Sequence, residues 1–174
     1  MRHHSFFSTI GVFLVLFLVG TSGYLWGDHC NLEIVSERCI DFTADRSSFT
    51  LTFSSFTAGS VTNSVDVTYS VMSNDVVRSN GVVTARLSDV FPGIDLLAQF
   101  GSYTKKAGNA SLTAANSGFV TVPATDTGLA DKVVDSGNGR LMDGSFVVRY
   151  QAKALQDQAA GGQLRTLTVT FAAV

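Results

Sequence analysis

The chain has 174 residues, of which 45% are apolar and 15% are charged, and its formal net charge is −2. That length is sufficient for one domain with a substantial apolar core. The mild acidity excludes nucleic acid as an expected partner, because nucleic-acid binding normally requires a clustered basic surface. The one basic pair, Lys105-Lys106, is expected at a solvated loop tip.

The N-terminus has the pattern of a secretory signal peptide. Arg2 supplies positive charge, residues 10–20 are an unbroken apolar stretch, and residues 21–23 are the small residues that a signal peptidase reads. We therefore expect a hydrophobic signal helix within residues 1–23, a mature chain that starts near Tyr24, and export to the periplasm, the cell surface or the medium. The apolar stretch is shorter than the roughly 20 residues of a spanning helix. An uncleaved anchor is the alternative, and it would be the chain's only contact with a membrane.

Residues 24–47 are expected to form an N-terminal extension that carries both cysteines, Cys30 and Cys39. In an exported protein an even number of cysteines favours a disulfide. The closed loop is short, so the expected stabilisation is only about 2.5–3 kcal/mol. Free thiols and a metal site that recruits Asp28 and His29 are the alternatives, although the spacing of the two cysteines matches no zinc-ligand pattern.

The rest of the chain alternates apolar and polar residues with the period of two that β-strands show. The expected strands are residues 32–35 and 40–43 (a small hairpin or one kinked edge strand), then 49–53, 65–71, 83–87, 94–100, 111–114, 119–122, 132–134, 146–154 and 167–173. Asn80-Gly81 predicts a tight turn, and residues 101–109 predict a polar loop. No helix is expected after the signal peptide.

These strands predict an all-β domain over residues 48–174. Each short strand has one apolar face to bury, which favours an immunoglobulin-like two-sheet β-sandwich. A closed barrel is the alternative. In the closing strand, Leu167, Val169 and Phe171 are expected to face the core, and this strand is a candidate assembly strand.

Five segments carry a resemblance to a known group of proteins. They are Gly81–Leu87, Leu112-Thr113, Gly118–Val122, Gly144–Tyr150 and Leu167–Phe171. They resemble parts of exported bacterial β-sandwich proteins related to fimbrial subunits and spore-coat-U-like domains. The first segment resembles the core strand of those proteins, the second and third resemble the middle hairpin, and the last two resemble the final strand pair. Two features depart from that group: residues 161–165 replace its Gly-Thr-Tyr-like turn, and the two cysteines lie closer together. The resemblance implies a structural subunit that associates with itself or with another envelope protein.

The sequence shows no constellation of catalytic residues. His29 is the only histidine that follows the signal peptide, and no Gly-x-Ser-x-Gly motif is present. We therefore expect no enzymatic activity and no cofactor, with an unrecognised secreted hydrolase as the alternative. A calcium site is an alternative, in which Asp131, Asp135, Asn138 and Asp143 would supply the oxygens, but their spacing does not fit the twelve-residue calcium loop. Clusters of Asp, Asn and Gly are also typical of turns.

Two further observations concern the surface. Tyr103, in the expected polar loop, is the best candidate for an exposed aromatic contact, whereas Tyr69 and Tyr150 are expected in the core. Asn109-Ala110-Ser111 is a glycosylation sequon.

Taken together, the sequence predicts a secreted, non-enzymatic structural or adhesive cell-surface subunit, pilus-like or coat-like. Strand addition is the expected mode of assembly, with residues 24–43 as the donor segment. A monomeric extracellular module that binds carbohydrate or protein is the alternative.

Overall fold

The computed structural model describes residues 13–18, 40–74, 80–157, 159 and 161–173. These residues form eleven strands and no helix, so the predicted all-β class is confirmed. In this described part of the chain, therefore, no helix has the length and apolarity to cross a membrane.

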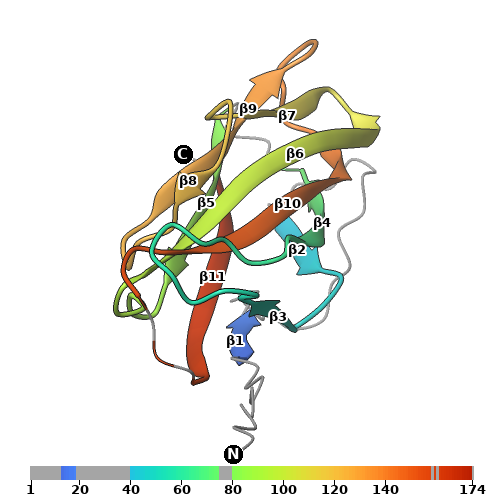
Figure 1. The fold of residues 1–174 in the computed structure, drawn as a ribbon. Coiled ribbons are helices and arrows are strands. Elements are labelled where there is room, and N and C mark those ends of the chain that lie inside the picture. The colour runs from blue at the N-terminus through green and yellow to red at the C-terminus, as the bar shows by residue number, and fades with distance from the viewer. Residues whose placement is uncertain (1–12, 19–39, 75–79, 158, 160, 174) are drawn as a thin grey trace, which may run out of the picture.

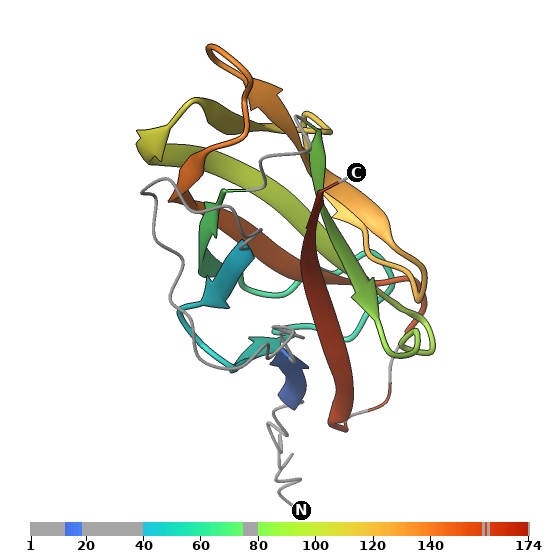
Figure 2. The same cartoon turned by 180° about the vertical axis from the view of Figure 1, so that it is seen from behind.

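The strands lie in two sheets (Figures 1 and 2). In chain order they are β1 (Phe13–Leu18), β2 (Ile40–Ala44), β3 (Ser48–Thr52), β4 (Val65–Ser73), β5 (Gly81–Leu87), β6 (Ile94–Gly108), β7 (Ala110–Ala114), β8 (Val120–Thr121), β9 (Thr127–Val134), β10 (Met142–Ala154) and β11 (Gln163–Ala173). Sheet A has the order β3-β1-β11-β5-β9-β7, and sheet B has the order β2-β4-β10-β6-β8. Neighbouring strands are antiparallel except for β1 and β11, which are parallel. The fold is sandwich-like, as two layers of half-buried strands require.

The apolar core draws on alternate residues of both sheets. The predicted inward positions of β11, Leu167, Val169 and Phe171, are buried in sheet A. Tyr69 of β4 and Tyr150 of β10 are buried in sheet B, as predicted, and their hydroxyl oxygens lie 2.9 Å apart in a hydrogen bond. That bond satisfies two phenols that would otherwise be costly to bury.

The polar loop predicted over residues 101–109 is wrong, because β6 continues to Gly108. Its polar second half keeps pairing with β10, up to the pair of Gly108 with Met142. The register shifts at Asp143/Gly144 and at Phe146/Val148, so β6 carries extra residues at two bulges. The bulges interrupt the alternation of apolar and polar residues, and this interruption resembled a loop in the sequence.

Two further local predictions are wrong. The strands of the expected middle hairpin lie in different sheets, since β7 pairs with β9 in sheet A and β8 pairs with β6 in sheet B. The tight turn expected at Asn80-Gly81 is also not formed there. Gly81 is already the first residue of β5, and neither residue has a positive φ.

The N-terminal predictions fall mostly outside the described residues, which include neither Cys30 and Cys39 nor His29. Within the expected signal helix, residues 13–18 form the strand β1 instead. An unbroken apolar run is compatible with either a helix or a strand that is buried on both faces. In the expected N-terminal extension, residues 40–44 form β2 and pair with β4 in sheet B.

Candidate functional site

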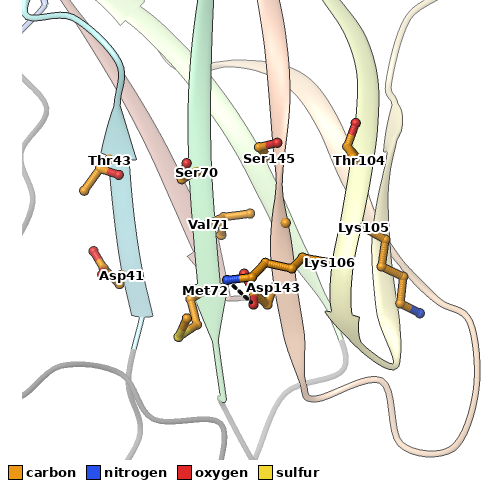
Figure 3. A pocket seen from close by; sticks show the side chains of 11 residues that line it. Asp41, Thr43, Ser70, Val71, Met72, Thr104, Lys105, Lys106, Asp143 and Ser145 are labelled. Atoms are coloured by element: carbon orange, nitrogen blue, oxygen red, sulfur yellow. Dashed lines mark ion pairs between the residues drawn. The ribbon is translucent and has the colours of Figure 1, made fainter.

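A groove of about 520 Å³ lies on sheet B, across the neighbouring strands β2, β4, β10 and the second half of β6 (Figure 3). Its lining residues come from all four strands: Asp41, Thr43, Ser70, Val71, Met72, Thr104, Lys105, Lys106, Asp143, Gly144 and Ser145. Most of them occupy the positions that alternate with the core residues, so the groove opens on the outer face of the sheet.

Four hydroxyl side chains form a row across the groove (Figure 3). Thr43 lies opposite Ser70, Ser70 opposite Ser145, and Ser145 opposite Thr104. Neighbouring strands lie about 4.8 Å apart, so the row is roughly 14 Å long. None of the four hydroxyls has a hydrogen-bond partner among the described residues. The row therefore offers both donors and acceptors to a ligand.

A second row carries charge and lies beside the first. The bulge in β6 inserts Lys106 between the pair of Lys105 with Gly144 and the pair of Ala107 with Asp143. This places Lys106 Nζ 3.4 Å from a carboxylate oxygen of Asp143. The Asp143 residue is only 9% exposed, whereas the Lys106 side chain is 75% exposed. Among the described residues, the buried carboxylate thus has one ion pair, from an exposed lysine, and can accept further hydrogen bonds.

Lys105 is engaged elsewhere. Its Nζ donates to Asp135 Oδ2 at 2.9 Å, and the Ser111 hydroxyl donates to Asp135 Oδ1 at 2.6 Å. These two hydrogen bonds, chiefly the one from Ser111, lower the pKa of Asp135. Asp41, on the opposite side of the groove, has no ion pair or hydrogen bond within the described part of the chain. The solvated loop tip expected at Lys105-Lys106 is wrong, because both lysines lie on β6 and each is paired with an aspartate.

Tyr103 is not the exposed loop residue that the sequence predicted. It lies in β6, half-buried, and its hydroxyl is buried with no hydrogen-bond partner among the described residues. Burial, together with the nearby carboxylates of Asp143 and Asp135, raises the pKa of Tyr103 to about 12. The ring lies against Gly144, where a Cβ atom would come within 2.5 Å of both the Tyr103 hydroxyl and the Thr104 carbonyl oxygen. Glycine at this position is therefore a packing requirement.

Of the four residues considered for calcium, all except Asp131 have other partners in the part of the chain that the structure describes. Asp135 is bound to Lys105 and Ser111, Asp143 is paired with Lys106, and Asn138 Oδ1 accepts from the side-chain amide of Asn109. Among the described residues there is no group of three or more acidic, histidine or cysteine side chains that could hold a metal ion. The amide of the sequon asparagine, Asn109, serves here to link β6 to the segment before β10.

A second feature lies in sheet A, where β1 fills the position between β3 and β11 (Figures 1 and 2). Leu16 lies opposite Phe49 of β3 on one side and Arg165 of β11 on the other. We call this position, bounded by β3 and β11, the slot. With β1 in place the candidate assembly strand β11 is an internal strand, and β3 reaches the rest of sheet A only through β1.

No protein-family model matches this chain, and no curated protein matches its sequence. The groove was not found by sequence reasoning, because its residues lie between positions 41 and 145 and only the strand register brings them together. The available signal was the presence of short hydroxyl side chains at outward positions of four separate strands.

Proposed function

We propose that this chain is a secreted, non-enzymatic structural or adhesive subunit of the cell surface, with an immunoglobulin-like sandwich that is completed by strand addition. One observation supports the proposal above all others. The strand that fills the slot, β1, consists of residues 13–18, which belong to the apolar core of the expected signal peptide.

Signal cleavage near Tyr24 would remove β1 completely. The edges of β3 and β11 that face the slot would then lose their backbone partners. Unpaired strand edges are costly when buried and promote association when exposed. The inward side chains of β3 would also lose part of their support. Phe49 and Leu51, now 6% and 0% exposed, belong to a strand that is joined to the rest of sheet A through β1. A strand from another molecule would restore both ladders.

The donor strand in this proposal is residues 24–39 of a neighbouring copy. The sequence suggested residues 24–43, but residues 40–43 already pair with β4 as part of β2. The segment 32–35, expected to be a strand, lies inside the remaining donor and offers Leu32 and Ile34 on one face. The Cys30–Cys39 disulfide, which stays a prediction, would hold the two ends of the loop that contains this segment within about 7 Å, so the donor strand would be only a part of residues 24–39, such as residues 32–35.

The experiment compares two chains, residues 24–174 and residues 40–174, by hydrogen exchange and by size. The longer chain should associate and protect the backbone amides of β3 and of β11. The shorter chain should be monomeric and exchange faster in those two strands, while β4 and β10 stay protected in both. Equal protection of β3 and β11 in the two chains, without association, would contradict strand addition.

A monomeric binding module is the second candidate function, and the groove on sheet B favours it. The groove and the slot are separate features, because the groove residues belong to sheet B and the slot belongs to sheet A. An adhesive subunit would use both features, one for assembly and one for a ligand.

A further inference from the structure

We propose that the groove on the outer face of sheet B binds a neutral polyhydroxylated ligand, a short stretch of saccharide chain. This inference does not depend on strand addition, because the groove residues come from β2, β4, β6 and β10 and none of them borders the slot.

The hydrogen-bonding groups of the groove suit a saccharide. The hydroxyls of Thr43, Ser70, Ser145 and Thr104 each have one donor and two acceptor positions, with no partner among the described residues. A ligand that covers this row must both donate and accept at short intervals. Sugar hydroxyls do both, and a row of roughly 14 Å is long enough for more than one ring.

The buried carboxylate of Asp143 also favours such a ligand. Its residue is nine-tenths buried and lines the groove, yet within the described part of the chain its carboxylate is held only by the ion pair with Lys106 at 3.4 Å. A buried carboxylate normally has several hydrogen-bond donors around it. Its open acceptor positions therefore favour a ligand that donates, and charge-assisted hydrogen bonds of this kind are the strong ones.

The charges of the groove argue against other ligand classes. Lys106 is paired with Asp143 and Lys105 with Asp135, so the lysines do not form an anion site. Asp41 adds a carboxylate that has no partner in the described part of the chain. Among the described lining residues only Val71 and Met72 have apolar side chains, and Val71 is itself buried in the core, so the groove lacks the cluster of apolar side chains that a lipid or an aromatic drug-like ligand needs. Strand addition by a peptide uses the backbone of a sheet edge, whereas the hydroxyls and the Asp143 carboxylate of the groove lie on a face of sheet B.

The volume of the groove is also suitable for a short saccharide. About 520 Å³ lies within the range of roughly 300–1,000 Å³ that small-molecule sites occupy. The bulge in β6 helps to form the site, since it brings Lys106 to Asp143 beside the hydroxyl row, and bulges are common next to binding sites.

The test is a titration of the full ¹⁵N-labelled chain with four probes: cellotriose, maltotriose, mannotriose and triacetylchitotriose. We expect at least one probe to shift the amide signals of Ser70, Ser145 and Thr104 in a saturable manner below about 10 mM. Asp143→Asn should weaken binding of that probe at least about tenfold, the loss expected for one charge-assisted hydrogen bond. Ser145→Ala, which leaves the carboxylate in place, should weaken it severalfold.

The matched control is Asp66→Asn. Asp66 lies on the same outer face, at 2.7 and 2.8 Å from Arg149, but outside the groove. This variant should bind like the parent chain, and circular dichroism should show all three variants folded. The proposal is overturned if none of the four probes shifts the spectrum, if the shifted amides lie outside the groove, or if Ser145→Ala and Asp143→Asn both bind as tightly as the control.

Discussion

Replacing Phe171 with alanine tests the register of β11, which underlies both the core and the slot. The Phe171 side chain is 6% exposed and lies opposite Val83 of β5. Its ring carbons lie 3.2 Å from the point where a Cβ atom at Gly81 would stand, so the ring also covers that glycine. Removing it leaves a cavity that the neighbouring strands cannot close, and Phe171→Ala should cost about 3–5 kcal/mol. That is a large share of the 5–15 kcal/mol total stability typical of a domain.

The matched control is Thr170→Ala, one residue earlier in the same strand. Thr170 is half-buried, lies opposite Thr84, and points to the other face of sheet A. Its replacement should cost less than half as much as Phe171→Ala. Urea unfolding followed by circular dichroism gives both values, provided that the slope with denaturant is unchanged. Equal losses from the two variants would mean that the faces of β11 are not as described, because a shift of one residue exchanges the two faces.

Three further predictions concern the core, the groove floor and export. Burial raises the pKa of Tyr69 and of Tyr150, so the unfolded chain loses these protons first as the pH rises. The two protonated phenols therefore contribute fully to the free energy of unfolding below a pH of about 10, and this contribution is lost progressively above it. The free energy of unfolding should fall above that pH, and it should fall less in the Tyr69→Phe/Tyr150→Phe variant. A fall of the same size in that variant would contradict this. Gly144→Ala should lower stability by at least about 1–3 kcal/mol, whereas Gly128→Ala, with no atom within 4 Å of the new Cβ, should be close to neutral in thermal unfolding. Similar melting of the two glycine variants would contradict the close packing of β6 on β10. Mass spectrometry of the protein from its host should give a first residue near Tyr24, whereas a retained Met1 in the membrane fraction would indicate an anchor.

The strands with clean alternation were predictable, and those with bulges were not. Phe49 and Leu51 in β3, or Val67 and Tyr69 in β4, alternate with polar residues without interruption, and their buried faces were predicted correctly. In β6, by contrast, two bulges shift the alternation, so the second half looked like a loop. A bulge is set by the partner strand, and a single sequence holds little information about it.

The groove and the slot were not predictable for a related reason. Both depend on which strands are neighbours, and strand order is a long-range property. Ser70 and Ser145 are unremarkable outward residues until β4 and β10 pair and place them opposite each other. Likewise, the apolar residues 13–18 fit a signal helix by composition, and only the pairing with β3 and β11 shows the position that a strand must fill.

The most direct test of the proposed function is the size distribution of the processed protein, recovered from its host and measured at rising concentration, with its N-terminus sequenced. We predict that molecules beginning near Tyr24 form oligomers, because the slot between β3 and β11 is then open to the donor segment of a neighbour. Molecules that begin near Tyr24 and remain strictly monomeric at high concentration would contradict assembly by strand addition.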